Sequence, residues 1–395
     1  MTAVEFRNVD IVFGQNEKQA LALADQGASR SEIHDRTGAV LGASNINLSI
    51  EPGQICVLMG LSGSGKSTIL RAVNRLNRVS RGAVLVEHRG RAVDVACCDD
   101  ATLRDIRMRT VSTVFQSFAL LPWRTVRDNV GLGLELRGMK RPERARIVDE
   151  KLAMVGLGQW GDKYVSELSG GMQQRVGLAR AFATDAEILL MDEPFSALDP
   201  LIRDKLQDEL LDLQKTLRKT IVFVSHDLDE AMKLGNTIAI LEGGRIVQAG
   251  TAEDILLHPA DAYVAEFVKH VNPLNVLRGH AVMKPIGSLT IDDGEVVLDA
   301  LGRIRVRLDD DGRPVGVMLD GRAGRLTECP HDGEVPTANP TDILVAPVDL
   351  KLKAAIGLKR QTGHPIMLVD QLGRLAGLCG DEEIYNSLLR RRAES

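Results

Sequence analysis

The sequence predicts an α/β fold built on a mainly parallel β-sheet, with a second, smaller domain after it. Short, continuously apolar runs alternate with helical patterns, and these runs lie at residues 55–59, 188–191, 221–224 and 238–241. Apolar strands separated by helices are typical of a parallel sheet that is covered on both faces. The chain has 395 residues, whereas single cores stop growing at roughly 250–300 residues. We therefore expect more than one domain.

Changes in the sequence pattern indicate where the chain divides. Residues 15–41 interrupt an early pair of strands and carry two helical segments, so we interpret them as a helical insertion. Ser29 and Glu32 have the spacing of a capping box, which opens the second of these helices. Near residues 271–273 the pattern becomes rich in short alternating strands and turns. The predicted divisions are a first domain at 1–271, with a helical subdomain at about 117–183, and a second domain at 272–395.

The bulk composition excludes several classes of protein. The formal net charge of −5 gives no reason to expect nucleic acid as a partner, because nucleic-acid binding usually needs a basic face. The five cysteines contain no C-x-x-C pair, so we expect reduced thiols. The first residues carry no apolar signal region. No apolar run reaches the roughly 20 residues that span a bilayer, so membrane association is expected only through a partner.

A glycine-rich segment between a strand pattern and a helical pattern matches the phosphate-binding motif G-x-x-x-x-G-K-[ST]. Its glycines let backbone N–H groups converge on phosphates, and the following helix N-terminus adds partial positive charge. We expect Lys66 to reach the β- and γ-phosphates of ATP and Ser67 to ligate Mg²⁺. The predicted ATP-binding residues here are Gly60, Leu61, Ser62, Gly63, Ser64, Gly65, Lys66, Ser67 and Thr68.

Two carboxylates follow the apolar run at residues 188–191. A buried strand that ends in acids places them at the edge of the sheet where ligands bind. We expect Asp192 to hold the coordination shell of Mg²⁺. We expect Glu193 to act as the general base that polarises the attacking water. The pattern alone is only moderately specific, but the phosphate-binding motif makes the catalytic interpretation much stronger.

Residues 168–175 read Leu-Ser-Gly-Gly-Met-Gln-Gln-Arg and resemble the signature motif of ABC (ATP-binding cassette) ATPases. The resemblance covers residues 1 to about 270. It implies a P-loop NTPase fold with a mainly parallel core sheet, an antiparallel β subdomain and a helical subdomain. Physically, the motif is a second phosphate site at the start of a helix. The residues implied for this site, which faces the ATP of another subunit, are Ser169, Gly170, Gly171, Met172 and Gln173.

Other segments match the remaining elements of the family in order. The resemblance implies that Gln116 contacts Mg²⁺ and water and senses the membrane partner. It implies that Asp199 lies in the loop at the dimer seam. His226 matches the switch histidine, which bonds the γ-phosphate and helps to hold Glu193 and the water. Phe13 occupies the place of the aromatic residue that stacks on adenine, with a core phenylalanine as the alternative.

The resemblance also implies partners and a location. ABC ATPases form a head-to-tail homodimer in which each ATP lies between the phosphate loop of one copy and the signature of the other. Closure of such a site excludes water and completes the catalytic residues. The expected partners are integral-membrane permease subunits and a periplasmic or extracellular substrate-binding protein. The expected location is peripheral, on the cytoplasmic face of the bacterial inner (plasma) membrane.

Longer segments narrow the match within the family. Residues 59–65, 114–122, 191–202 and 225–232, together with the insertion, resemble the ATPases of quaternary-amine importers, the choline and glycine betaine/L-proline group. Residues 55–59 and 121–126 are closer to the choline members. This implies an ATPase that powers uptake of choline, with glycine betaine/L-proline as the alternative cargo. The ATPase does not touch the solute, so no residue here reads it.

The end of the chain resembles one half of a CBS module, of which this group often carries a pair. Residues 363–378 match its strand–turn–strand, and we expect the order helix, strand, helix, strand, strand, helix over residues 341–392. Cys379 departs from the usual Thr or Ser, although Glu382 suits the acidic position. Residues 275–329 are at best a degenerate first copy. We therefore favour a role in dimerisation or regulation over nucleotide binding.

Two other classes compete with the importer hypothesis. Soluble ABC ATPases that act on DNA or ribosomes usually carry two cassettes, a long coiled coil or zinc-binding cysteines, and the sequence has none of these. A non-catalytic regulatory module would not need Lys66, Asp192, Glu193 and His226 together. Co-purification with a permease would separate the importer from the first class, and ATP turnover would exclude the second.

Overall fold

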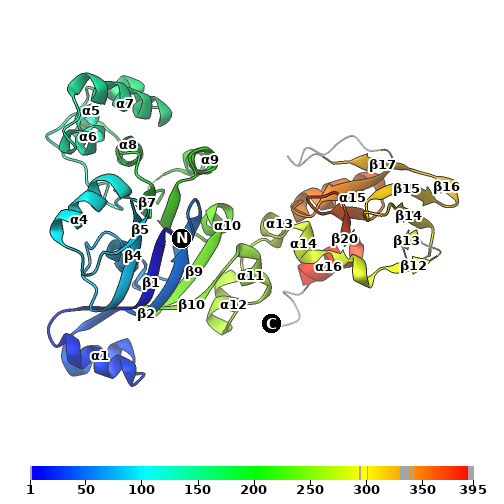
Figure 1. The fold of residues 1–395 in the computed structure, drawn as a ribbon, viewed down its shortest axis with the longest axis horizontal. Helices are drawn as coiled ribbons and strands as arrows, with labels where there is room; N and C mark the ends of the chain where they lie inside the picture. The colour runs from blue at the N-terminus through cyan, green and yellow to red at the C-terminus, as the bar shows by residue number, and fades with distance from the viewer. Residues whose placement is uncertain are drawn as a thin grey trace. The chain divides into compact units, whose positions relative to one another are not determined.

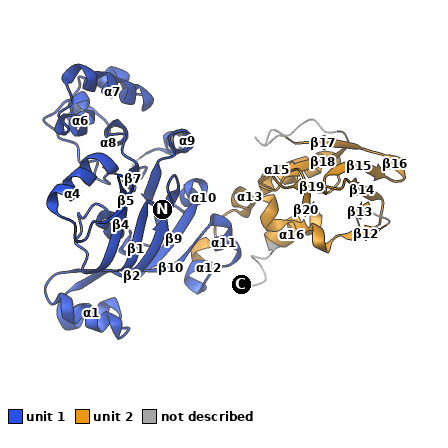
Figure 2. Ribbon diagram, in the orientation of Figure 1, with its two compact units in different colours: residues 1–264 blue, residues 265–395 orange. Residues whose placement is uncertain are grey.

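The computed structural model describes residues 2–196, 198–292, 295–299, 301–329, 339 and 342–389. The chain forms two compact units, residues 1–264 and 265–395 (Figure 2). This division falls inside helix α12 (Ala262–Val268), slightly before the boundary predicted at residues 271–273. Each unit is described by itself below.

The first unit is organised around a six-stranded sheet in the order β10-β9-β3-β8-β7-β6 (Figure 1). The strands from β9 to β6 are parallel to one another, and only β10 is antiparallel to its neighbour. All residues of β3, β7 and β8 are buried, which explains their continuously apolar sequences. The prediction of a mainly parallel sheet is confirmed. The strands are β3 (Ile55–Met59), β6 (Val111–Val114), β7 (Ile188–Asp192), β8 (Thr220–Val224), β9 (Thr237–Glu242) and β10 (Arg245–Gly250).

A second, antiparallel sheet shares a hydrophobic core with the first. Its order is β2-β1-β4-β5, from β1 (Val4–Phe13), β2 (Val40–Ile50), β4 (Arg81–His88) and β5 (Arg91–Asp94). Phe6 and Val84 of this sheet pack in one cluster with Leu58 and Val222 of the parallel sheet. Ile69 of helix α3 (Lys66–Ala72) belongs to the same cluster. The core therefore fixes the start of α3 against both sheets.

The helical insertion forms between β1 and β2, as predicted. Helix α1 spans Glu17–Asp25 and helix α2 spans Arg30–Thr37. The predicted capping box is present, with Ser29 and Glu32 each bonding the backbone of the other. The insertion buries a small core of its own, in which Leu23 and Ile33 contact Leu41 of β2.

Four α-helices form the predicted helical region, and Figure 1 shows them gathered at one end of the unit. They are α5 (Val126–Val130), α6 (Leu132–Leu136), α7 (Arg141–Met154) and α8 (Gly170–Ala183). The remaining helices that follow strands are α4 (Asp100–Asp105), α9 (Pro200–Leu217), α10 (Leu228–Leu234) and α11 (Ala252–Leu257). Leu206 and Leu210 form the expected buried stripe of α9, and the side chain of Leu213 lies outside the described residues.

The second unit contains two sheets around one core. One sheet has the order β11-β20-β19-β18-β17, and the other is an antiparallel meander from β12 to β16. Val306 and Val317 of the meander pack against Ile343, Met367 and Leu378 of the first sheet. The elements are α13 (Pro273–Val276), α14 (Gly279–Val282), β11 (Lys284–Pro285), β12 (Thr290–Asp292), β13 (Glu295–Val297), β14 (Ile304–Leu308), β15 (Pro314–Leu319), β16 (Arg322–Ala323), β17 (Arg325–Glu328), β18 (Asp342–Pro347), α15 (Leu352–Thr362), β19 (Ile366–Val369), β20 (Leu375–Cys379) and α16 (Asp381–Leu389).

The prediction for this unit is partly wrong. The order β18, α15, β19, β20, α16 matches the expected tail, except that a strand already begins at Asp342 where a helix was expected first. Residues 290–323 form an antiparallel meander with no helix between its described strands, so they do not repeat this order as a degenerate first copy. Their alternating apolar pattern suits a half-exposed sheet. The turn at 293–294, most of the loop at 330–341 and the basic cluster at 390–392 lie outside the described residues.

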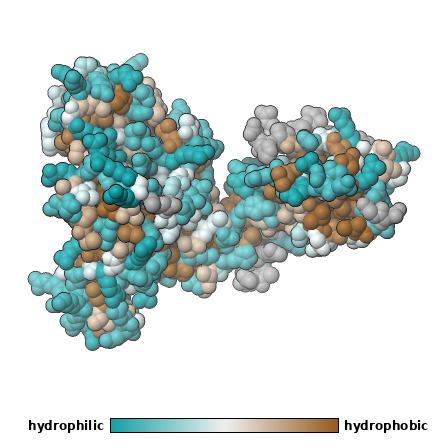
Figure 3. All heavy atoms as spheres, viewed as in Figure 1, coloured by the Kyte–Doolittle hydropathy of each residue, from teal (hydrophilic) through white to brown (hydrophobic). Residues whose placement is uncertain are grey.

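Figure 3 shows hydrophobic residues scattered among hydrophilic ones over the visible face of the first unit and gathered in a patch on that of the second. Within the part of the chain that the structure describes, no helix combines the length and the apolarity that crossing a membrane needs.

Candidate nucleotide-binding site

The phosphate-binding loop joins β3 to α3 and adopts a backbone that only glycine accommodates at two points. Gly60 has φ 144° and Gly65 has φ 104°. A Cβ at Gly60 would lie 2.2 Å from the carbonyl oxygen of Leu241, and one at Gly65 would lie 2.5 Å from that of Gly42. Both positions therefore combine left-handed backbone with close approach of neighbouring carbonyls. The predicted loop context, strand before and helix after, is confirmed.

Lys66 is folded against the loop that precedes it. Its Nζ donates to the carbonyl oxygens of Gly60 and Leu61, both at 2.9 Å. Burial lowers the pKa of the Lys66 ammonium, and the nearby Glu193 and Asp192 oppose that shift. The buried Ser64 Oγ has no hydrogen-bond partner among the described residues. A glycine-rich loop that surrounds a cationic side chain at the start of a helix suits a polyphosphate.

Asp192 lies at the carboxyl end of β7 and is bonded to two residues of α3. Its Oδ1 accepts from Ser67 Oγ at 2.7 Å, and its Oδ2 accepts from Arg71 Nη2 at 2.9 Å. Asp192 is buried, with 1% of its surface exposed, so the guanidinium offsets a charge that burial would otherwise penalise. A hydroxyl and a carboxylate oxygen side by side are ligands that Mg²⁺ accepts. These residues therefore fit the predicted metal.

Glu193, Gln116 and His226 converge from three elements. Glu193 Oε2 accepts from Gln116 Nε2 at 3.1 Å and lies 3.3 Å from His226 Nδ1. Gln116 follows β6, and His226 follows β8. Glu193 itself has φ 48°, a left-handed conformation, and its backbone N–H donates to the carbonyl of Val224 at 3.1 Å. The turn thus aims the carboxylate at the histidine and the glutamine rather than along the strand.

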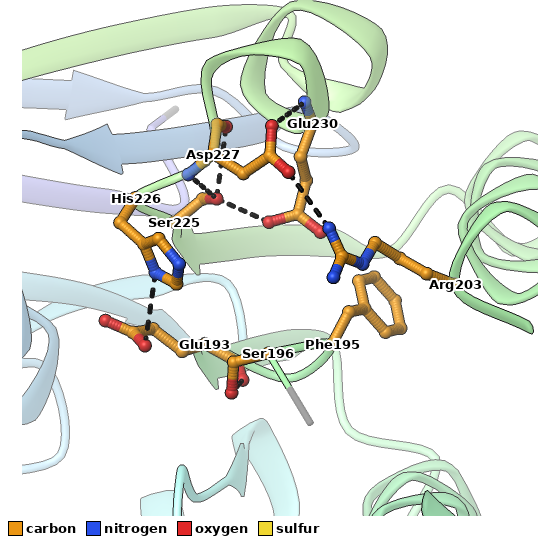
Figure 4. A pocket seen from close by; sticks show the side chains of 8 residues that line it. All are labelled: Glu193, Phe195, Ser196, Arg203, Ser225, His226, Asp227 and Glu230. Carbon is orange, nitrogen blue, oxygen red and sulfur yellow. Dashed lines mark hydrogen bonds and ion pairs between the residues drawn. The ribbon is translucent and has the colours of Figure 1, made fainter. Parts of the chain in front are cut away.

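A polar network lies behind His226 and lines a pocket with it (Figure 4). Ser225 Oγ accepts from the N–H of Asp227 at 2.9 Å and is hydrogen-bonded to the carboxylate of Glu230. Arg203 of α9 donates to Asp227 Oδ2 at 3.0 Å. Burial raises the pKa of Glu230. Because Ser225 and Asp227 flank the histidine, this network fixes the backbone that carries it.

The signature residues lie at the start of α8 and bond mainly within their own segment. Ser169 is the N-cap, and its Oγ accepts from the N–H of Met172 at 3.4 Å. Gln173 Nε2 donates to the carbonyl of Leu168 at 3.1 Å. Ser169 and Gly170 are exposed. In the described part of the chain, no hydrogen bond or ion pair joins residues 169–173 to the phosphate-binding loop.

Asp199 and Phe13 complete the predicted set. Asp199 is the N-cap of α9, where its Oδ1 accepts from the N–H of Ile202 at 3.1 Å, and the neighbouring Ala197 lies outside the described residues. Phe13 ends β1 and is 40% exposed. A Cβ at Gly42 would lie 2.6 Å from its ring and 3.0 Å from Thr68 Cγ2. Phe13 is thus a partly exposed ring at the edge of the phosphate-binding loop rather than a buried core residue.

Sequence reasoning missed several charged residues that bond to this site. The spacing in the sequence could have predicted the role of Arg71, because it lies one turn after Ser67 and so shares the same face of α3. No sequence pattern predicts the contacts of Arg203 and Glu230, since these depend on how α9 and α10 pack. Arg30, from the insertion, donates to the loop carbonyl of Gly63 at 2.7 Å across a long sequence separation.

Comparison with known proteins agrees with this architecture. The ABC transporter family matches residues 43–196. The glycine betaine/proline betaine transport system ATP-binding protein ProV of Escherichia coli K12 is 49% identical over 319 residues, which are 80% of this chain and 78% of that protein. The glycine betaine transport ATP-binding protein OpuAA of Bacillus subtilis is 38% identical over 95% of this chain and 90% of its own length.

Among solved structures, a dimeric, post-hydrolysis structure of the ATP-binding cassette MJ0796 bound to ADP and Pi is 31% identical. It superposes with a TM-score of 0.54 and covers 63% of this chain and 98% of that chain. The fold is therefore a P-loop NTPase of the ABC cassette type. The chain belongs to the ATP-binding subunits of ABC transporters, in the group of quaternary-amine importers, and is an ATPase coupled to transport.

Proposed function

We propose that this chain hydrolyses ATP to ADP and phosphate at a site completed by a second copy, and that hydrolysis powers import of a quaternary amine. The observation that carries the proposal is the convergence of Glu193, Gln116 and His226 beside the phosphate-binding loop. The carboxylate lies 3.1 Å from the amide and 3.3 Å from the imidazole. This group is separated from the signature segment of the same chain, which is exposed.

Within one chain, each residue has a distinct role in hydrolysis. Glu193 polarises the attacking water as general base, and Gln116 and His226 orient that water and the carboxylate. Lys66 and the loop amides bind the β- and γ-phosphates of ATP. Ser67, Asp192 and the side-chain oxygen of Gln116 would hold Mg²⁺. The metal neutralises charge on the phosphate oxygens when bound. Phe13 stacks on adenine.

The signature segment serves the other copy. In a head-to-tail homodimer, Ser169, Gly170 and Gly171 at the start of α8 face the γ-phosphate held by the partner subunit. Met172 and Gln173 continue that turn, and Asp199 lies at the seam. Two observations support this arrangement: the exposure of Ser169 and Gly170, and the dimeric assembly named for the MJ0796 cassette.

The transporter context supplies the other partners. We expect integral-membrane permease subunits, a periplasmic or extracellular substrate-binding protein, and a peripheral position at the cytoplasmic face of the inner membrane. A largely apolar groove supports a permease contact, since Phe115, next to Gln116, lines it together with Leu132 and Leu136. Leu136 is 68% exposed. An apolar segment of the permease that binds in this groove would contact Phe115. This contact would link the permease to Gln116 and so to the nucleotide-binding site.

For the cargo, we propose glycine betaine or proline betaine ahead of choline. The sequence pattern favours choline, but relatives that match 80% and 95% of the chain are named for glycine betaine transport, the first of them also for proline betaine. A choline transport ATP-binding protein of Bacillus subtilis, OpuBA, matches 58% of this chain at 43% identity. The comparison therefore reverses the preference while keeping the quaternary amine as the class of solute.

Uptake in a deletion strain tests this function. Labelled glycine betaine, proline betaine and choline are supplied to cells that carry either the wild-type chain or Lys66→Ala. We expect the wild type to restore uptake of the betaines, and Lys66→Ala to fail because the phosphates lose their cation. Restoration of choline uptake alone would reverse the order of cargoes. No uptake of any of the three, despite ATP turnover by the complex, would refute the importer role.

A further inference from the structure

The helical insertion is attached to the nucleotide-binding core by two arginines. Arg81 of β4 joins the end of α1 to β1: it pairs with Asp25 at 2.7 Å and with Asp10 at 2.7 Å. Both pairs raise the pKa of Arg81. This fork anchors α1 at the side of the sheet. The second arginine, Arg30, lies in the first turn of α2 and reaches the phosphate-binding loop.

Arg30 donates to three backbone carbonyls, two from adjacent residues of β2 and one from the phosphate-binding loop. Nε donates to Leu41 at 2.5 Å, Nη2 to Gly42 at 3.0 Å and Nη1 to Gly63 at 2.7 Å. Arg30 is half-buried, and burial lowers the pKa of its guanidinium. A planar guanidinium is the one side chain that offers several donors in a fixed fork. Arg30 therefore ties β2 to the middle of the loop.

The bond to Gly63 matters because three other carbonyls of the loop are held by groups other than Arg30. Lys66 Nζ holds those of Gly60 and Leu61, and the N–H of Gly244 donates to that of Ser64 at 3.1 Å. Gly63 has φ 79°, and a Cβ placed on it would meet nothing within 4 Å. Among the described residues, no neighbouring atom fills the space beside the Gly63 Cα, and Arg30 supplies the side-chain hydrogen bond that holds the Gly63 carbonyl.

We propose that Arg30 is a positioning residue for the phosphate-binding loop, so that the helical insertion sets the affinity for ATP. The inference rests on the proposed function of the loop. Arg30 acts on both ends of the nucleotide: it bonds the carbonyl of Gly42, the residue against which the ring of Phe13 lies, and that of Gly63 in the loop. It pre-orders the loop before ATP arrives, which reduces the ordering cost of binding.

The test compares two variants of Arg30 with the wild type, each as the full chain assembled with its permease. Arg30→Met keeps the length of the side chain and removes every donor. We expect its KM for ATP, and the dissociation constant of a fluorescent ATP analogue, to rise about tenfold, which corresponds to about 1.4 kcal/mol. At saturating ATP, kcat should stay within about twofold, because the loop is ordered once the nucleotide is bound. Arg30→Lys should lie between, since one ammonium can serve Gly63 but not all three carbonyls.

Two controls separate this role from general stability. Arg36→Met removes an exposed cation from the same helix and should leave KM unchanged. Asp25→Ala loosens α1 without touching Arg30, and it should lower the melting temperature more than it raises KM. The inference is overturned if Arg30→Met leaves KM unchanged, if it lowers kcat instead, or if Asp25→Ala raises KM as much. Failure of the proposed function looks different: Lys66→Ala would then bind ATP as well as the wild type.

Discussion

The two regions of this chain that we propose to bind phosphate differ in how fully their polar groups are bonded to other elements. Around the phosphate-binding loop, side chains from α3, from the end of β7 and from the segments after β6, β7 and β8 are joined by short bonds, such as the 2.7 Å contact of Ser67 with Asp192. At the start of α8, the polar groups of Ser169 and Gln173 bond to neighbours in their own segment. The first region is ordered by bonds between different elements. The second is exposed, and in the described part of the chain no other element bonds the backbone N–H groups of its helix N-terminus.

Under the proposed split site, this difference explains why one chain alone would be insufficient for hydrolysis. A binding region whose groups are pre-ordered can hold ATP alone, because little ordering remains to be done. A region that presents an uncovered helix start can act only on a ligand brought by another molecule. We therefore expect mutations in the first region to act within a monomer and mutations in the second to act only in the dimer. The predictions below test that separation, from the largest expected effect to the smallest.

Glu193→Gln should have the largest effect. The carboxamide keeps the shape and one acceptor but cannot take a proton, so turnover should fall by about 10²- to 10⁴-fold. ATP binding should persist and the chain should accumulate as a closed dimer, detected by size-exclusion chromatography with ATP. Glu187→Gln, an exposed acid just before β7, is the matched control. Undiminished turnover in Glu193→Gln would remove the residue from its assigned role.

Ser169→Arg should separate the two regions most clearly. A long cation at the N-cap fills the helix start and loses the bond to Met172, so the dimer cannot close on the partner's ATP. Turnover should fall to the level of Glu193→Gln, whereas the affinity of the monomer for a fluorescent ATP analogue should be unchanged. Ser166→Arg places the same charge one turn earlier and should spare turnover. If Ser169→Arg abolished nucleotide binding by the monomer, the split between the two regions would be wrong.

The same contrast explains what the sequence could and could not predict. The strands, the phosphate-binding loop and the capping box of Ser29 with Glu32 depend on residues close in the chain, so local patterns reveal them. The bonds of Arg30 to Gly63 and of Arg203 to Asp227 depend on how distant elements pack, and no spacing encodes them. The meander at residues 290–323 was misjudged for a related reason: alternating strands specify a sheet but not its partner strands.

Phe13→Ala should weaken ATP binding without changing the chemistry. Loss of a stacking ring costs roughly 1–3 kcal/mol in comparable base–aromatic contacts. Because Phe13 belongs to the region around the phosphate-binding loop, we expect the affinity for ATP to fall in the monomer as well as in the dimer. The kcat at saturating ATP should be nearly unchanged. Phe13→Tyr keeps the ring and should bind ATP normally. An equal loss for ATP and for inorganic triphosphate, measured by calorimetry, would show that the ring does not contact adenine.

Glu230→Gln should have the smallest effect. It should change the stability of the folded chain rather than the affinity for ATP. Burial raises the pKa of Glu230, so the folded chain keeps this proton at pH values where the unfolded chain has lost it. That contribution is full below the ordinary glutamate pKa and is lost as the pH rises through the raised value. Glu230 accepts from Gln207 Nε2 at 3.0 Å as well as bonding Ser225. Glutamine does not titrate, and it can still bond both residues. Its melting temperature should therefore fall less steeply across this window, by a few degrees at most for a difference of about 1 kcal/mol. A parallel fall in both proteins would mean that Glu230 does not titrate within the network that supports His226.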